Sequence, residues 1–157
     1  MNELDHIRQI KDADIDEVSM LVRRCIDASC RESYSDRGRT YWASLYSREM
    51  FSKYTEGWKF WILSLDGRIV GCAGLNRNEI KGIFVAPEMQ GKKLGQRLLN
   101  FVEYYARSRG IKRLFLDSSL NAVDFYRRAG YVYLEDKKYE TDLQSGMLGV
   151  VRMMKDM

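Results

Sequence analysis

The chain is poor in the residues that many nucleophilic and metal-dependent sites use. It has one histidine, His6, so a Ser–His–Asp or Cys–His catalytic arrangement has no other imidazole available. A histidine-based metal site lacks support for the same reason, and we predict no bound metal. The three cysteines, Cys25, Cys30 and Cys72, are odd in number and follow no zinc spacing. We interpret Cys25 and Cys30 as small apolar residues of an early helix.

Long hydrophobic runs are also absent. No segment approaches the ~20 apolar residues of a membrane-spanning helix, and polar residues follow Met1 where a secretory leader would be apolar. These features predict a protein of the reducing cytoplasm with no membrane partner. Of the 157 residues, 45% are apolar and 31% are charged, which predicts a single globular domain over residues 1–157. The net charge of +4 suits a polyanionic cofactor and is too small to indicate nucleic-acid binding.

The order of the apolar patterns predicts one mixed sheet flanked by helices. We expect strands at 6–10, 59–65, 68–75, 79–85, 113–117, 131–139 and 149–154. We expect helices from Asp14 or Asp16 onward and over 39–54, 94–108 and 121–129, with loops at 30–40 and 140–146. Asp66-Gly67 predicts a type I′ hairpin turn, and the strand–helix–strand order of 79–117 predicts a parallel crossover. The predicted class is α+β, or mixed α/β.

The most informative segment is the loop between the strand at 79–85 and the helix at 94–108. The single proline, Pro87, marks the turn, and the loop Gln90-Gly91-Lys92-Lys93-Leu94-Gly95 follows, with Gln96 next. Such a loop presents backbone N–H groups at a helix N-terminus, where these donors lack intrahelical partners and the helix dipole is positive. It therefore predicts a socket for a phosphate or pyrophosphate. The glycine spacing fits neither a P-loop nor a dinucleotide fingerprint.

Three further features bear on chemistry. Tyr126 lies in the segment 121–131, and its phenol is a proton donor at neutral pH because the ordinary pKa is about 10. Asn121 offers an amide to a ligand, and Glu79 is a carboxylate that accepts a proton from an attacking ammonium. Taken alone, these residues are explained better by packing, helix capping and an exposed strand end. The aromatic segment between Tyr34 and Trp58 fits both simple packing on the sheet and the wall of a binding cleft.

Taken together, these stretches resemble the GCN5-related N-acetyltransferase (GNAT) family. The acyl-CoA loop of that family has the form Gln/Arg-x-x-Gly-x-Gly/Ala, which Gln90 and Gly95 match, whereas Lys93 replaces the usual glycine. We expect a helix-initiating conformation to accommodate the Lys93 side chain. The stretch 119–131 resembles the second cofactor motif, and 151–155 resembles the last strand. The resemblance implies a single domain with a central, mostly antiparallel sheet, split into a V.

The resemblance also implies a site. The bulge that splits the sheet would lie near Phe84 and Val85, and acetyl-CoA would bind in the split as a co-substrate, with no metal. Glu79 would act as the base and Tyr126 as the acid in a direct attack that needs no acyl-enzyme. The implied cofactor-binding residues are Phe84, Val85, Gln90, Gly91, Lys92, Lys93, Leu94, Gly95, Gln96, Asn121 and Tyr126.

We expect the acceptor to be a primary amine of a small molecule, because the aromatic segment suits a small or amphipathic ligand. A protein N-terminal or lysine amine is the alternative acceptor, and a non-catalytic acyl-CoA-binding regulatory module is an alternative function. A third class, a nucleic-acid binder using Lys92, Lys93 and Arg97, would show steep salt dependence. A homodimer is the default assembly, since symmetric dimers are the commonest.

Overall fold

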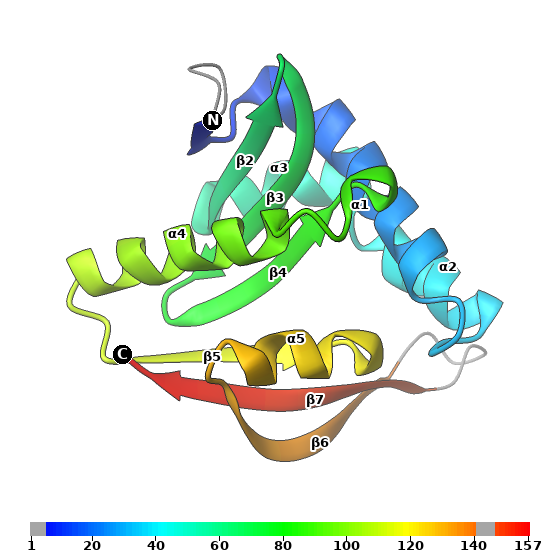
Figure 1. Cartoon of the computed structure of the whole chain (residues 1–157). Helices are drawn as coiled ribbons and strands as arrows, with labels where there is room; N and C mark the ends of the chain where they lie inside the picture. Colours follow the sequence, from blue (N-terminus) through cyan, green and yellow to red (C-terminus); the bar gives the residue numbers. More distant parts are fainter. Residues whose placement is uncertain (1–5, 141–146) are drawn as a thin grey trace.

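The computed structural model describes residues 6–140 and 147–157 (Figure 1). The strands are β1 (His6–Gln9), β2 (Lys59–Leu65), β3 (Arg68–Asn76), β4 (Glu79–Val85), β5 (Arg113–Ser118), β6 (Val132–Glu140) and β7 (Met147–Asp156). The helices are α1 (Ile15–Ser29), α2 (Asp36–Ser44), α3 (Arg48–Gly57), α4 (Leu94–Ser108) and α5 (Val123–Arg128). Short 3-10 turns lie at Asp12–Asp14, Pro87–Met89 and Leu120–Ala122.

The strands form a seven-stranded sheet in the order β1-β2-β3-β4-β5-β7-β6. Neighbouring strands are antiparallel except for the parallel pair β4 and β5, which the crossover through α4 joins. That pair is short: Glu79 lies opposite Phe115 and Ile80 lies opposite Leu116, and beyond these residues the strands separate (Figure 1). The predicted α+β class with a V-split mixed sheet is therefore confirmed.

The irregularity in β4 falls at Lys81, so the expected bulge near Phe84 and Val85 is wrong. Leu75 of β3 pairs with Ile80, whereas Gly74 pairs with Gly82, which leaves Lys81 as the extra residue. The position has a local cause, because Gly82 takes a φ of +145°, a conformation that side chains rarely adopt. Phe84 and Val85 lie in regular register opposite Cys72 and Gly71.

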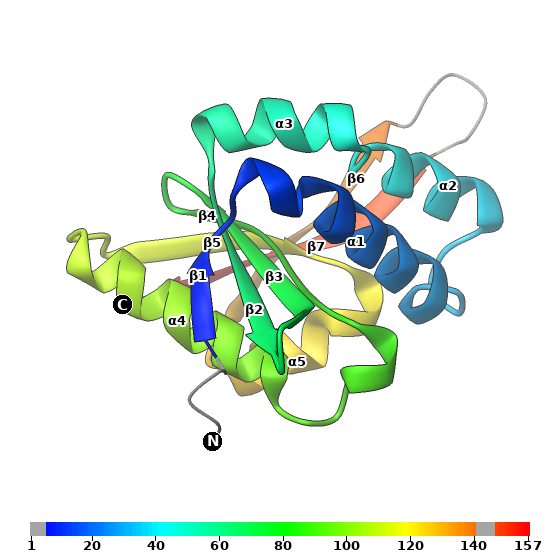
Figure 2. The same ribbon diagram turned by 90° about the horizontal axis from the view of Figure 1, so that it is seen from above.

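Helices cover both faces of the sheet (Figures 1 and 2). The apolar stripe of α4, which includes Leu98, Leu99 and Val102, is buried against Leu114 and Leu116 of β5 and against β2–β4. On the opposite face, α1 and α3 pack on β2–β4 around a second buried set that includes Val18, Ile26, Phe51, Phe60 and Ile62. The two cores hold β4 from both sides, while the edge of β4 that faces β5 stays open past Ile80.

The single helix predicted for 39–54 is wrong, because two helices occupy this region. The Ser35 side chain accepts a hydrogen bond from the backbone N–H of Gly38 at the start of α2. In the same way, Ser47 accepts one from the N–H of Met50 at the start of α3. The loop expected at 30–40 therefore ends at Ser35.

The other expected elements lie within a few residues of the observed ones. Asp66 and Gly67 have φ values of +48° and +76°, as the predicted hairpin turn requires. The expected helix at 121–129 is a 3-10 turn followed by α5, and β7 begins two residues before the predicted strand. The predicted loop at 140–146 lies outside the described residues except for Glu140, which ends β6.

Candidate functional site

A cavity of about 1140 Å³ lies where β4 and β5 separate. Its walls come from α1, α2, α3, β4, the start of α4, α5 and β7. It brings together every residue that we predicted for the site except Lys92, which is exposed in the loop. The predicted residues in its lining are Glu79, Phe84, Val85, Gln90, Gly91, Lys93, Leu94, Gly95, Gln96, Asn121 and Tyr126. Their roles remain predictions.

The loop before α4 has the backbone geometry of an anion socket. Gly91 and Lys93 have φ values of +78° and +61°, and Lys93 is the residue that precedes the helix. The expected helix-initiating conformation of Lys93 is thus wrong, because its backbone is left-handed, which costs a residue with a Cβ about 1–2 kcal/mol. The N–H of Arg97 closes the first turn on the carbonyl of Lys93 at 3.0 Å. The N–H groups of residues 94–96 therefore have no intrahelical acceptor.

The open edge of β4 presents alternate main-chain groups to the split. The N–H of Ala86 donates to the carbonyl of Val70 at 2.8 Å, and Phe84 lies opposite Cys72 in the same register. Because hydrogen bonding alternates along an antiparallel pair, Phe84 turns its main chain toward β3, whereas Ile83 and Val85 turn theirs toward the split. The register therefore favours Ile83 over the predicted Phe84 as the main-chain partner next to Val85.

Gln90 ties the loop to the end of β4. Its side-chain amide donates to the carbonyl of Val85 at 3.2 Å and to Ser29 Oγ at 2.9 Å. The thiol of Cys25 donates to the same carbonyl at 3.0 Å. Burial raises the pKa of Cys25 to about 12, so this thiol stays neutral. The expected role of Cys25 as a small buried residue fits this environment.

Tyr126 places a neutral phenol in the cavity wall. Its side chain is 6% exposed, and its ring contacts those of Phe125 and Tyr131 with centroids 5.0 Å and 5.8 Å away. Burial raises the pKa of Tyr126 well above its usual value. Within the described residues, its hydroxyl has no hydrogen-bond partner. Asn121 lies in the 3-10 turn before α5, and its side-chain amide oxygen, Oδ1, accepts from Cys30 Sγ at 3.5 Å.

Charged side chains from four strands form a network of ion pairs, which we call the ion cluster: Glu79, Lys81, Asp117, Lys137 and Arg152. All of them except Lys137 line the cavity. Glu79 accepts hydrogen bonds from Lys81 Nζ at 2.6 Å and from Arg152 at 2.5 Å. Arg152 also donates to Asp117 at 3.1 Å, and Lys137 Nζ lies 3.4 Å from Asp117. Partial burial alone would raise the pKa of Glu79, but the hydrogen bonds and charges of Lys81 and Arg152 outweigh it and lower that pKa.

Sequence reasoning found Glu79 and missed its partners. Asp117, Lys137 and Arg152 come from β5, β6 and β7, so long-range strand pairing brings them to Glu79, whereas Lys81 lies two residues along β4. One signal was available, because Arg152 interrupts an apolar strand at a position where β7 is mostly buried.

The aromatic segment lines the cavity beside the ion cluster, with Trp58 next to Lys81. Tyr41, Trp42, Tyr46, Tyr54 and Trp58 line it, so the interpretation as a cleft wall describes these side chains. The rings of Tyr54 and Trp58 stack with centroids 4.2 Å apart. Packing is the better description for Phe51 of the same segment, which is fully buried.

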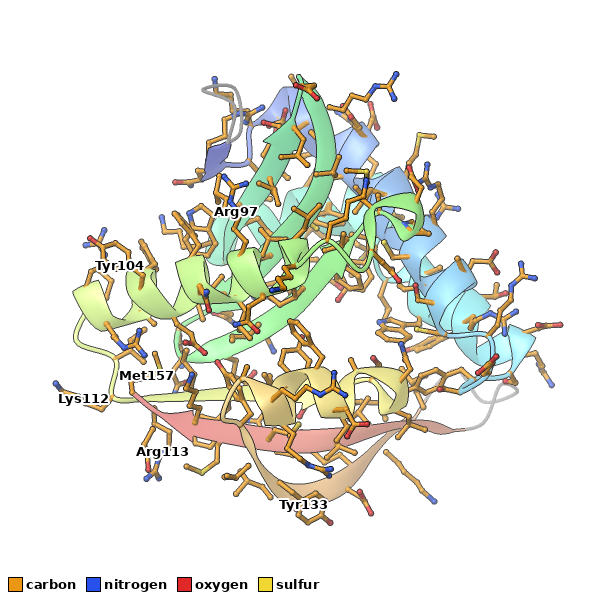
Figure 3. All side chains as sticks on the ribbon, viewed as in Figure 1. Arg97, Tyr104, Lys112, Arg113, Tyr133 and Met157 are labelled. Carbon is orange, nitrogen blue, oxygen red and sulfur yellow. The ribbon has the colours of Figure 1, made fainter. Side chains whose placement is uncertain are left out.

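The basic residues do not form one stripe. Lys112 and Arg113 lie at the end of α4 that is opposite the loop (Figure 3). Arg113 pairs there with Asp156 at 2.6 Å. Within residues 6–140 and 147–157, no group of three His, Cys, Asp or Glu side chains has the arrangement of a metal site, and no helix has the length and apolarity to cross a bilayer.

Comparison with known proteins decides the family. The sequence model of the acetyltransferase (GNAT) domain matches residues 30–145, which is most of the chain. The chain belongs to the GNAT family. The predicted family is therefore confirmed.

Curated relatives of this GNAT chain match it in part. An amino-acid acetyltransferase of Ralstonia nicotianae is 39% identical over 80 residues, which are 47% of this chain and 18% of that protein. An IAA acetyltransferase of Azospirillum brasilense is 29% identical over 82 residues, 46% of this chain and 54% of that protein. The matched segments thus span about half or less of these relatives.

Solved structures match the whole GNAT fold. A GCN5-related N-acetyltransferase of Rhodopseudomonas palustris is 24% identical with a TM-score of 0.91, covering 100% of this chain and 98% of that one. The PaiA N-acetyltransferase of Thermoplasma acidophilum, solved in complex with coenzyme A, is 21% identical with a TM-score of 0.76 and full coverage of both chains. At these identities the likeness shows the fold.

Proposed function

We propose that this chain is an N-acetyltransferase that moves the acetyl group of acetyl-CoA to a primary amine of a small molecule by direct attack. One observation carries the proposal. The amides at the start of α4 open into a cavity that continues along the unpaired edge of β4 to Tyr126 and the ion cluster. An anion socket, an open strand edge, a neutral phenol and a carboxylate thus lie along one cavity.

The cofactor fits this order of groups. The pyrophosphate rests on the amides of residues 90–96, with the ammonium groups of Lys92 and Lys93 nearby. The pantetheine amides pair with the main chain of Ile83 and Val85, and Asn121 contacts the same arm. The Thermoplasma acidophilum neighbour was solved in complex with coenzyme A, which supports this choice of cofactor.

The chemistry then follows from the residues at the inner end. A neutral amine attacks the thioester carbonyl carbon, a C–N bond forms, and the C–S bond breaks to release the CoA thiolate. A main-chain N–H on the open edge of β4 polarises the carbonyl oxygen. The amine proton passes to Glu79, directly or through water, and the Tyr126 hydroxyl gives its proton to the thiolate. Placing the two reactants side by side supplies most of the rate.

The lowered pKa makes Glu79 a weak base, but the same cations also act on the substrate. Lys81 and Arg152 disfavour a third positive charge beside them, so they lower the pKa of a bound ammonium as well. The pKa of the substrate ammonium therefore falls together with the pKa of Glu79. The difference between these two pKa values, which governs the proton transfer, changes less than the pKa of Glu79 itself.

A panel of primary amines, assayed with acetyl-CoA by thiol release, tests the transfer. We expect release with small amines, and we expect heat from CoA binding in titration calorimetry. The absence of binding heat from CoA or acetyl-CoA, with the protein shown to be folded, would contradict the proposal. Release that is faster with peptide amines than with any small amine would support the alternative acceptor, a protein N-terminus or lysine.

A non-catalytic acyl-CoA-binding regulatory module is the second candidate. The double contact of Glu79 with Lys81 and Arg152, which weakens it as a base, favours this alternative. Binding of acetyl-CoA without thiol release across the whole amine panel is the outcome that would select it.

A further inference from the structure

The ion cluster has more cations than carboxylates. Lys81, Lys137 and Arg152 surround Glu79 and Asp117, and each carboxylate contacts two of the cations. Among the described residues of the cluster, one positive charge is in excess, although the four members that line the cavity, Lys81 and Arg152 with Glu79 and Asp117, balance one another. The anion socket lies at the start of α4, at the other end of the cavity, so the pyrophosphate does not account for this charge.

Lys81 is the cation that is best placed to meet a ligand. It is the extra residue of the β4 bulge, it lines the cavity, and its side chain is 28% exposed. An ammonium has three N–H donors, and the hydrogen bond to Glu79 uses one of them. Within the described residues, Lys81 Nζ has no other hydrogen-bond partner.

An aromatic surface lies beside the same ammonium. Lys81 Nζ is 5.3 Å from the ring centroid of Trp58, and Trp58 stacks on Tyr54. Tyr41, Trp42 and Tyr46 extend this surface along the cavity. A ligand that reaches Lys81 therefore has flat apolar area within contact distance of its other groups.

We propose that the acceptor amine carries a carboxylate and an aromatic or bulky apolar group, as an aromatic amino acid does. This inference rests on the proposed acetyl transfer. The carboxylate accepts hydrogen bonds from the free N–H donors of Lys81, while the apolar group packs on Tyr54 and Trp58. A polycationic amine is rejected because its further ammonium groups would lie beside Lys81 and Arg152.

Binding to the CoA-loaded protein tests the proposal without requiring turnover. The probes are L-phenylalanine, phenethylamine, which lacks only the carboxylate, L-alanine, which lacks the ring, and spermidine. We expect L-phenylalanine to bind at least tenfold more tightly than each of the others, in line with one charged hydrogen bond or one buried ring. Equal or tighter binding of phenethylamine or spermidine would overturn the proposal, and so would failure of L-phenylalanine to bind.

CoA binding is measured first, because it tests the cofactor site separately from the class of acceptor. Heat from CoA with no preference for L-phenylalanine overturns the acceptor class and leaves the cofactor site standing. No heat from CoA overturns both.

Substitution of Lys81 localises the effect. Lys81→Met is expected to weaken L-phenylalanine binding tenfold or more, to leave CoA binding unchanged and not to weaken phenethylamine binding, because phenethylamine has no carboxylate to lose a partner. Lys81→Arg retains the preference for L-phenylalanine. Lys53→Met is the control, because Lys53 is an exposed α3 residue that pairs with Glu49 and lies outside the cavity lining. Loss of binding for both amines alike, with CoA binding intact, would contradict a carboxylate contact at Lys81.

Discussion

At the scale of single residues, Lys93 combines a backbone cost with a charge at the proposed anion socket. Its left-handed conformation suits glycine, and its side chain lines the cavity. The sequence identified Lys93 as the departure from the family loop, but the sign of φ depends on how the loop joins α4 and was not predicted.

Lys93→Gly is expected to raise the free energy of unfolding by about 1 kcal/mol, because glycine adopts positive φ without the Cβ penalty. Denaturant unfolding measures this change. The same variant should bind CoA less tightly at low salt, with a weaker salt dependence, since one cation is lost. Lys92→Gly is the matched control. Lys92 has no positive φ, so its replacement should not stabilise the protein.

Tyr126→Phe removes the hydroxyl and keeps the ring packing against Phe125 and Tyr131. We expect kcat to fall about 10²-fold or more, as for loss of a general acid, with little change in CoA affinity. Rapid-quench kinetics and calorimetry measure the two quantities. An unchanged rate, with chemistry shown to be the slow step, would remove Tyr126 from the acid role.

The lowered pKa of Glu79 predicts that the protein loses stability in acid. The pKa of Glu79 in the folded protein is lower than the ordinary value of 4.5. Its contribution to the free energy of unfolding is therefore complete above pH 4.5 and is lost as the pH falls through the lower, folded-state pKa. The stability difference between wild type and Glu79→Gln should therefore shrink on acidification. Denaturant unfolding from pH 7 downward measures it, with the exposed Glu49→Gln as control. A difference that stays constant with pH would contradict the ion pairs.

At the scale of elements, prediction succeeded where one pattern decides the structure. The bounds of β4 and α4 match the prediction because a β-branched strand and an amphipathic stripe each show a clear period. The prediction failed between α2 and α3, where it placed a single helix. Ser47 caps α3 there, but Met50 occupies the position where a capping box would show Glu or Gln, so the sequence lacks that signature.

Ser47→Ala should lower the free energy of unfolding by about 1 kcal/mol, because the N–H of Met50 loses its acceptor. Ser52→Ala, within α3, is the control and is expected to have no destabilising effect, since alanine is the better helix former. Urea unfolding compares them. Equal losses in both variants would mean that the Ser47 cap contributes nothing.

At the scale of the whole molecule, the ion cluster was beyond sequence reasoning. Glu79 and Arg152 lie 73 positions apart, and the strand order β4-β5-β7-β6 brings Asp117, Lys137 and Arg152 to Glu79 and Lys81. Most of the residues proposed to bind the cofactor could be placed in one cavity from the sequence, because they lie close together around one loop. The acceptor side joins α2, α3 and four strands.

CoA binding should stabilise the entire fold, because the unfolded chain has no site. At a free concentration one hundred times Kd, the free energy of unfolding is expected to rise by about 2.7 kcal/mol. Denaturant unfolding with and without CoA measures it, and adenosine at the same concentration is the control. Absence of a shift at saturating CoA would contradict a site formed by folding.

The two-residue pairing of β4 with β5 has a mechanical consequence. Little backbone bonding joins the β1–β4 half of the molecule to the β5–β7–β6 half, so the shared apolar core under α4 and the ion pair between Glu79 and Arg152 hold the halves together. The main-chain groups of β4 past Ile80 are left without a neighbouring strand on that edge. An extended amide chain that entered the wedge would pair with them in the manner of an eighth strand.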